Sequence, residues 1–444
     1  MKVVRAKAAR TVWTALAIAA ALAVSSHWLK RIRLAPPELS AVSVYRVTSA
    51  ADAGLGSLRE GILAADRTNG RARLVIAVSH IDLETPLPPL VNPEGVVVDA
   101  TASRAVLDAS RLQGGPVLDL LAPDCVIVGL QIIHAPAEAI LVRKGGARLQ
   151  HITVADGGVA VYQVDGASDL VVEGSTFERN TVGVQLAASG APVKLRDNRF
   201  VSHRRAAVWG VAAAPLLAAQ LAGVDILRNR FIGDYQSVVI FNLQARLEGN
   251  TLENANGAAI YVHGTRFAIS HNRIRAGRDF GISVEQSEHG LIAQNEIDHN
   301  CAGGIIVRNA RNTIVSANRL YANGYGVIVM EGRSVSPNTI TGNLITQHIG
   351  DGLYVIGGSP ILRHNRLLQN QKAGLRFSSL ETIGREMLTP NPLLDENQVI
   401  GNGHDDIQRD RYTESKTSPL STAGDCSWRS TMQPVEAVRV GGQS

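Results

Sequence analysis

The sequence predicts an all-β fold, a right-handed parallel β-helix whose short strands stack as the turns of a solenoid. Three observations predict it: a phrase that recurs about every 23 residues, 42 glycines among 444 residues, and an aromatic content of only 4%. Many short strands joined by tight turns explain this composition better than helices around one globular core.

The first 33 residues are predicted to be a signal or membrane anchor. Residues 11–29 carry no charge and follow four basic residues, and this run approaches the roughly 20 residues that a membrane-spanning helix needs. The run is longer than the hydrophobic region of a typical signal peptide, which has about 7–15 residues. Trp28, Lys30 and Arg31 lie at its C-terminal end, where aromatic and basic residues mark the membrane interface of a spanning helix. We expect an uncleaved inner-membrane anchor with its N-terminus inside. A cleaved signal peptide is the alternative, and both place the body in the periplasm or outside the cell.

The distribution of charge and the positions of the cysteines indicate which partners, metals and disulfides to expect. Residues 1–33 carry seven basic residues and no acid, so the chain's net charge of +5 leaves 5 − 7 = −2 for the remainder. A nearly neutral body gives no reason to expect a nucleic-acid partner. Cys125, Cys301 and Cys426 fit no metal-ligand spacing, and their odd number argues against a disulfide framework. We expect Cys125 to be a core residue and predict no metal or cofactor.

The solenoid is predicted to occupy residues 34–410. Val44–Val47 is predicted to be its first strand, and Ser57 with Glu60 three residues later forms a capping box that begins an amphipathic helix. A helix here would cover the open end of the core, as a stack of repeats requires. Residues 411–444 are rich in Ser, Thr and Gly and are predicted to be a loose C-terminal tail.

An asparagine marks each repeat from about residue 195. The positions are Asn198, Asn229, Asn250, Asn272, Asn295, Asn318, Asn343, Asn365 and Asn397. We expect these side chains to stack at one turn, each amide bonding to the next, as amide ladders do in other stacked sheets.

A second phrase, Gly-Ile-x-Val, keeps step with the asparagines. It occurs, with Ala in place of Gly or Val or Leu in place of Ile at some positions, at residues 259–262, 281–284, 304–307, 326–329 and 352–355, and more faintly at 139–142, 158–161 and 183–186. Its second and fourth residues are apolar and its third varies. Because side chains alternate along a strand, the apolar pair is predicted to face inward and the variable residue outward.

These residues resemble a known superfamily. Arg46-Val47-Thr48 and Gly56-Ser57-Leu58-Arg59-Glu60, followed by these repeats, are similar to secreted bacterial right-handed β-helix proteins. That superfamily includes mannuronan C5-epimerases, polysaccharide lyases, polygalacturonases and phage depolymerases, and also a periplasmic protein of copper-site assembly. The resemblance covers roughly residues 42–405. The alginate epimerases place Asp-Pro-His on an outward strand. Here the corresponding residues are Tyr261-Val262-His263, without Asp-Pro-His-Asp, and Asp279 matches an Asp that precedes the next strand in those epimerases.

The outward positions of the Gly-Ile-x-Val strands gather polar side chains over three successive turns. In chain order the outward pairs are Trp209 and Val211, Val239 and Phe241, Tyr261 and His263, Ser283 and Glu285, Ile306 and Arg308, Ile328 and Met330, and Tyr354 and Ile356. Neighbouring strands lie about 4.8 Å apart. The polar members therefore share one patch, beside Arg278 and Asp279 in the adjoining turn.

This patch predicts chemistry on a uronate polymer. Removing the proton alpha to a sugar carboxylate requires that the carboxylate charge be neutralised, by Arg308 or Arg278. It also requires a base, for which His263 is the natural choice, while Tyr261 donates or accepts a proton on the opposite face. Proton return gives an epimer, and loss of the 4-linked sugar gives a lyase product. We expect His263, Tyr261, Asp279 and Arg308 to be catalytic, and Arg278, Glu285, Ser283, Trp209, Phe241 and Tyr354 to bind substrate, the aromatic ones by stacking on sugar rings.

Other interpretations of the same residues remain open. His263 is also consistent with a solvated surface histidine, Glu285 and Arg308 with a cross-strand ion pair, and Asp279 with a turn residue. A hydrolase would use paired carboxylates, for which Asp279 and Glu285 are candidates. This face has no acidic cluster for calcium. An apolar insertion at about residues 212–223 is predicted to wall or cover the face.

Two classes of function follow. The first is an extracytoplasmic protein that modifies an anionic polysaccharide as a C5-epimerase or lyase. The second is a non-catalytic polysaccharide-binding or scaffold protein of exopolysaccharide export or envelope assembly. Metal-site assembly is disfavoured because the chain has only 4 Met and 3 Cys.

Overall fold

The computed structural model describes residues 43–187, 193–212, 223–264, 266–331, 336–381, 386–404 and 406–411. The predicted anchor at residues 1–33, most of the insertion at residues 212–223, and the tail after residue 411 lie outside them. Among the described residues, no helix is long and apolar enough to cross a membrane.

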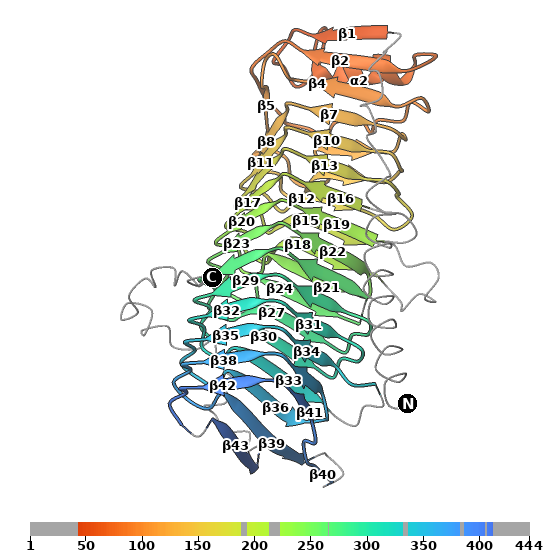
Figure 1. The fold of residues 1–444 in the computed structure, drawn as a ribbon. Helices are drawn as coiled ribbons and strands as arrows, with labels where there is room; N and C mark the ends of the chain where they lie inside the picture. The colour runs from red at the N-terminus through yellow and green to blue at the C-terminus, as the bar shows by residue number, and fades with distance from the viewer. Residues whose placement is uncertain are drawn as a thin grey trace, which may run out of the picture. The chain divides into compact units, whose positions relative to one another are not determined.

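Three long sheets run side by side along a coil (Figure 1), and from β6 onward each regular turn of the coil adds one parallel strand to each sheet, while β40 pairs antiparallel with β39. Sheet A contains β1 (Ser43–Val47), β2 (Ala72–Ile76), β4 (Val96–Asp99), β7 (Val126–Val128), β10 (Arg148–Gln150), β13 (Val171–Glu173), β16 (Val193–Arg196), β19 (Gly223–Leu227), β22 (Gln244–Glu248), β25 (Phe267–Ser270), β28 (Leu291–Ala293), β31 (Ile314–Ser316), β34 (Thr339–Thr341), β37 (Ile361–Arg363) and β41 (Leu393–Asp395). Sheet B contains β3 (His80–Asp82), β5 (Val106–Asp108), β8 (Gln131–Ile133), β11 (Thr153–Ala155), β14 (Thr176–Glu178), β17 (Arg199–Val201), β20 (Arg230–Ile232), β23 (Thr251–Glu253), β26 (Arg273–Arg275), β29 (Glu296–Asp298), β32 (Arg319–Tyr321), β35 (Leu344–Thr346), β38 (Arg366–Leu368) and β42 (Gln398–Ile400). Sheet C contains β6 (Leu118–Leu120), β9 (Glu138–Val142), β12 (Val159–Gln163), β15 (Val182–Ala187), β18 (Ala206–Val211), β21 (Val238–Phe241), β24 (Ile260–His263), β27 (Phe280–Glu285), β30 (Gly303–Arg308), β33 (Val327–Glu331), β36 (Leu353–Gly357), β39 (Leu375–Glu381), β40 (Met387–Leu388) and β43 (Ile407–Arg411).

Equivalent positions of successive repeats stack on one another. On sheet C, Ile260 lies opposite Ile282, and Ile282 lies opposite Ile305. All three are fully buried, and they belong to a core cluster that runs from Val47 to Phe377. Each turn covers the apolar face of its neighbour, so the core is continuous. The predicted parallel solenoid and the inward placement of the apolar pair are confirmed.

The predicted helix is also present, as α2 (Leu58–Asp66). The Ser57 hydroxyl accepts a hydrogen bond from the Glu60 backbone N–H at 3.2 Å, and the Glu60 carboxylate accepts one from Gly56, the residue before the cap. The helix packs against β1 and β2, at the first turns of the coil, and buries Leu58 and Ile62 in the core. It is the capping helix that the sequence predicted.

The asparagine ladder lies at the turn between sheets A and B. The Asn272 amide donates to Oδ1 of Asn295 at 3.0 Å and to the carbonyl of Leu247 at 3.0 Å, and the same Oδ1 accepts the Asn272 backbone N–H. This pattern repeats from Asn198 to Asn397. The ladder therefore satisfies buried backbone groups, and its role is structural.

A second ladder, which the sequence analysis missed, lies at the turn between sheets B and C. Its members are Asn180, His203, Asp234, Asn300, Asn323, His348, Asn370 and Asn402. His348 accepts the Asn323 backbone N–H at Nδ1, and burial lowers the pKa of His348 to about 3. Most members follow a first-ladder asparagine by five residues, which is the signal that would have revealed them.

The two described cysteines differ. Cys125 is buried and free, as predicted for a core residue, and burial raises the pKa of its thiol to about 11. Cys301 is disulfide-bonded. The spacing of the cysteines argued against a disulfide framework and did not predict this single bond.

Candidate functional site

The polar residues predicted on the outer face of sheet C lie where the repeat places them. Tyr261 is paired with Ser283, His263 with Glu285, and Glu285 with Arg308. These five side chains are half-buried. With Asp279, at the end of the turn that enters β27, they form a group that we call the sheet C patch.

A diagonal hydrogen bond crosses the patch. The Tyr261 hydroxyl donates to Oε2 of Glu285 at 2.7 Å. Burial, together with this bond and the charge of Glu285, raises the pKa of the Tyr261 phenol well above its usual range. The phenol is therefore held protonated at neutral pH. Glu285 takes Tyr261 as its partner, so the cross-strand ion pair with Arg308 that the sequence allowed is not formed.

Arg308 lies opposite Glu285 but forms no hydrogen bond or ion pair with any described residue. Its charge acts on Tyr261 and on Asp279, lowering the pKa of both groups. Burial nevertheless outweighs this effect at Asp279 and raises the pKa of its carboxyl, which, among the described residues, accepts only the Phe280 backbone N–H at 2.8 Å. Arg308 is thus a half-buried cation with neighbouring acidic groups but no bonded anion.

His263 has a ring nitrogen with no hydrogen-bond partner among the described residues and lies beside aromatic side chains. Its Nδ1 is buried without a hydrogen-bond partner, and its ring lies 5.6 Å from the ring of Phe241. Phe241 also contacts Trp209 and Tyr261, with ring centroids 5.9 and 5.5 Å away. The guanidinium of Arg205 lies 3.9 Å above the Trp209 ring. An aromatic strip therefore borders the patch on its N-terminal side.

Tyr354 does not line an open face. It is 3% exposed and belongs to an outer apolar cluster with Phe280, Ile306 and Ile328. Its hydroxyl shares a 2.9 Å hydrogen bond with Ser378, and the guanidinium of Arg376 lies 4.7 Å from its ring centre. The expectation that Tyr354 stacks on a sugar ring is therefore wrong, because neighbouring side chains already occupy its surface.

The turn beside the patch departs from the regular repeat. Ala255 and Gly277 occupy the second-ladder position in two successive turns, between the turns that carry Asp234 and Asn300, and the Gly277 N–H donates to Asn300 Oδ1 at 2.9 Å. The next two residues are Arg278, which is exposed, and Asp279, which is half-buried. The two charged turn residues that the sequence singled out therefore follow the second of two successive ladder positions that lack a polar side chain.

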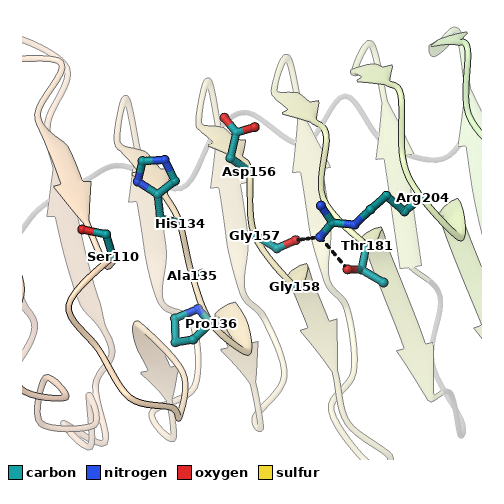
Figure 2. Close-up of a pocket in the computed structure, with 9 residues that line it drawn as sticks. All are labelled: Ser110, His134, Ala135, Pro136, Asp156, Gly157, Gly158, Thr181 and Arg204. Atoms are coloured by element: carbon teal, nitrogen blue, oxygen red, sulfur yellow. Dashed lines mark hydrogen bonds between the residues drawn. The ribbon is translucent and has the colours of Figure 1, made fainter.

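A concave pocket lies elsewhere, at the turn between sheets B and C several turns closer to the N-terminus (Figure 2). It has a volume of about 450 Å³. In it, Arg204 donates to the Gly157 carbonyl and the Thr181 hydroxyl, while Asp156 binds Arg179, outside the pocket lining. Arg204 and Asp156 therefore already have hydrogen-bond partners. In the sheet C patch, by contrast, Arg308 is not paired with Glu285.

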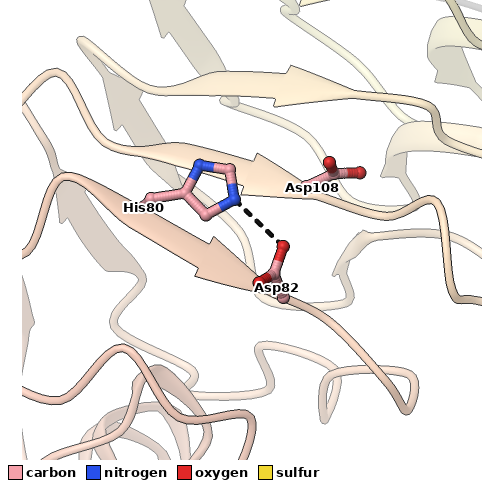
Figure 3. A group of neighbouring side chains, drawn as sticks. All are labelled: His80, Asp82 and Asp108. Atoms are coloured by element: carbon pink, nitrogen blue, oxygen red, sulfur yellow. Dashed lines mark hydrogen bonds and ion pairs between the residues drawn. The ribbon is translucent and has the colours of Figure 1, made fainter.

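A group of three metal-ligand side chains lies nearer still to the N-terminus. His80 and Asp82 share a 3.0 Å hydrogen bond, and Asp108 lies on the next strand in register with Asp82 (Figure 3). One donor atom from each residue lies within 4.8 Å of the others. Asp108 is also bonded to His134 at 3.0 Å. Three partly engaged donors are fewer than the four of a closed structural zinc site, and we assign the group no role.

Comparison with known proteins agrees with the fold. A family model described as "Right handed beta helix region" matches residues 216–372, and a search of curated proteins found no match. The chain folds as a right-handed parallel β-helix, and the matched region lies within its solenoid.

Solved structures with this fold include the periplasmic alginate epimerase AlgG, at 13% identity and a TM-score of 0.44, over 69% of this chain and 83% of that one. The α-1,3-glucanase catalytic unit of Streptomyces thermodiastaticus has 15% identity and a TM-score of 0.43, over 83% and 69%. The A-module of the Azotobacter vinelandii mannuronan C-5 epimerase AlgE6 has 9% identity and a TM-score of 0.43, over 83% and 100%. A shared fold does not determine an activity, so function must be inferred from the residues of this chain.

Proposed function

We propose that this protein modifies an acidic, uronate-containing polysaccharide by removing the proton alpha to the sugar carboxylate, as a C5-epimerase or a lyase. The observation that supports this most is Arg308, a half-buried guanidinium on an outer sheet face that binds no described carboxylate. A sugar carboxylate is an anion of the size and geometry that a guanidinium binds by two hydrogen bonds.

Arg308 supplies the charge neutralisation that the reaction requires. When the proton alpha to a carboxylate leaves, negative charge accumulates on the carboxylate oxygens, and a fixed cation stabilises that charge in the transition state. Arg278, exposed at the turn, is placed to bind a carboxylate of a neighbouring sugar.

His263 acts as the base and Tyr261 as the acid in the two proton transfers. His263 accepts the C5 proton, because a neutral imidazole carries a free nitrogen lone pair. Tyr261 is held in its protonated form by Glu285, so it acts as the acid. Donation of the phenol proton to C5 from the other face gives the epimer. Donation to the oxygen at C4, as the C4–O bond breaks and its electron pair leaves with that oxygen, gives the unsaturated lyase product.

The remaining residues position the polymer. Ser283 is half-buried beside Tyr261 and offers a hydroxyl to the sugar. Phe241 and Trp209 extend the face with aromatic surface on which sugar rings stack. Asp279 lies within the electrostatic reach of Arg308 and orients the guanidinium.

We place this activity outside the cytoplasm, in the periplasm or at the cell exterior. The uncharged run at residues 11–29, with basic residues on both sides, supports export and anchoring at the inner membrane. The disulfide at Cys301 is consistent with an oxidising compartment.

The test is to incubate the full-length protein with polymannuronate, polyguluronate and polygalacturonate in D₂O. Ultraviolet absorbance of an unsaturated uronate indicates a lyase, and deuterium at C5 without absorbance indicates an epimerase. If the protein binds a polymer but gives neither signal, the proposed chemistry is wrong, and the protein is instead a non-catalytic binding or scaffold protein.

A further inference from the structure

Five exposed arginines lie at one register position, which forms a column on the outer face of sheet B. The column consists of the residue that directly follows each first-ladder asparagine. This residue is arginine in five turns and another residue in the remaining turns. From the N-terminal side, the paired positions of the column are Arg199, Arg230, Thr251, Arg273, Glu296, Arg319, Leu344, Arg366 and Gln398. Arg199 and Arg366 are seven strands apart, a distance of roughly 34 Å at about 4.8 Å per strand.

Most of these arginines have no anionic partner. Arg199, Arg273 and Arg366 form no side-chain hydrogen bond or ion pair with a described residue. Arg319 lies over the ring of Tyr321, 5.4 Å from its centre. Arg230 alone has a carboxylate, that of Glu253 at 3.0 Å, on a side chain that keeps 57% of its surface exposed.

The acidic residue within the column forms no ion pair with the arginines beside it. Glu296 lies between Arg273 and Arg319, but its carboxylate accepts the Tyr321 hydroxyl at 3.1 Å instead of a guanidinium. In the part of the chain that the structure describes, the column therefore presents five exposed cations, of which Arg230 alone has an ion-paired carboxylate.

We propose that this arginine column binds an acidic polysaccharide lengthwise, as a second binding surface separate from the sheet C patch. Rigid strands hold the cations at multiples of one spacing along a line, which suits an extended polymer with regularly repeated carboxylates. Several weak contacts in a row then act together, although each exposed ion pair alone contributes little. The choice of a uronate polymer as the ligand rests on the proposed function. The existence of the arginine column does not depend on that function.

The column and the patch lie on different sheets, joined by the turn of the second ladder. A polymer held on sheet B keeps the protein attached while other sugars enter and leave the sheet C patch. Binding at the column is therefore expected to affect the affinity for long polymers and to leave turnover of short oligouronates unchanged.

The test uses the full-length protein and fluorescein-labelled polygalacturonate, with neutral dextran and a single-stranded DNA as comparison probes. The triple variant R273Q/R319Q/R366Q removes three column charges. Its matched control, R46Q/R148Q/R246Q, removes three arginines from the outer face of sheet A. We expect the column variant to bind polygalacturonate roughly tenfold more weakly at low salt, with a shallower salt dependence, and the control to stay within about twofold of the wild type.

Equal weakening in both triple variants would overturn the inference, because net charge alone would then explain binding. An unchanged affinity in the column variant, or equally tight binding of dextran, would also overturn it. Tighter binding of the DNA than of polygalacturonate would show that the polymer class is wrong. His263→Ala separates the two proposals, since it is expected to abolish turnover while it leaves binding at the column intact.

Discussion

The phenol of Tyr261 bonds at 2.7 Å to the carboxylate of Glu285, one strand away and two residues along. This diagonal contact occupies the carboxylate that lies directly opposite Arg308. Tyr261→Phe removes the proposed acid and keeps the ring. We expect it to lower kcat by roughly 10²–10⁴ with little change in folding. Tyr235→Phe, at an exposed tyrosine, is the control, and equal rates in the two variants would remove Tyr261 from the mechanism.

Arg308→Gln tests the anion-binding role. Loss of the cation is expected to lower kcat/KM on a uronate polymer by roughly 10²–10³, because the transition-state charge loses its stabilising partner. Arg308→Lys should recover part of that loss. Arg311→Gln, which disrupts a surface pair with Glu288, is the control. Steady-state kinetics that show no difference between the two glutamine variants would contradict the assignment.

Asp279 is expected to reduce stability at neutral pH. Burial raises the pKa of its carboxyl above the usual value of 3.8, so the ionised form is disfavoured in the folded protein. Below pH 3.8 the carboxyl is protonated in both the folded and the unfolded protein, and its contribution to stability is fully present. As the pH rises through the folded-state pKa the carboxyl must ionise while it is buried, and this contribution is lost. Asp279→Asn should therefore raise the free energy of unfolding at pH 7 by up to about 1 kcal/mol. Urea denaturation at pH 7 and pH 3.5 measures this, and a gain that is equal at both values would be inconsistent with it.

The first asparagine ladder is expected to contribute strongly to stability. Asn295→Ala removes the bonds from its amide to Ile269 and Asn318, and the acceptor for the Asn272 backbone N–H. Leaving such groups buried without partners is expected to cost roughly 2–4 kcal/mol. The urea midpoint is the measurement, with the exposed Asn256→Ala as control. Similar midpoints would show that the ladder is dispensable.

His348 makes stability depend on pH. Its pKa falls from 6.5 in the unfolded chain to about 3 in the folded protein. Stability linked to this group is therefore complete above pH 6.5 and is lost progressively as the pH falls toward 3. Between pH 7 and pH 5 the loss should be roughly 2 kcal/mol. His348→Asn keeps a ladder side chain and should remove this difference, whereas His271→Asn, at an exposed turn, should retain it. An unchanged pH dependence in His348→Asn would contradict the account.

Repeat spacing predicts stacking well because it is a property of the backbone. Counting along Gly-Ile-x-Val was enough to place Tyr261 beside Ser283 and to align His263, Glu285 and Arg308 in one column. The first ladder and the capping helix were predicted for the same reason, since both depend on residues at fixed offsets.

Side-chain partners were not predictable in this way. The bond from Tyr261 to Glu285 joins positions that are not paired in register, and it depends on the length and rotamer of both side chains. The burial of Tyr354 depends on Ile328 and Phe280, which come from other turns. The second ladder was hidden because histidine and aspartate replace asparagine at His203, Asp234 and His348.

The most direct test of the proposed chemistry is deuterium incorporation at C5 of a uronate polymer in D₂O, followed by NMR for wild type, His263→Ala and the control His271→Ala. We predict incorporation by wild type and by His271→Ala, and a loss of at least about 10²-fold in His263→Ala. Equal incorporation by all three proteins would show that His263 is not the base, and none from the wild type on any uronate polymer would contradict the account itself.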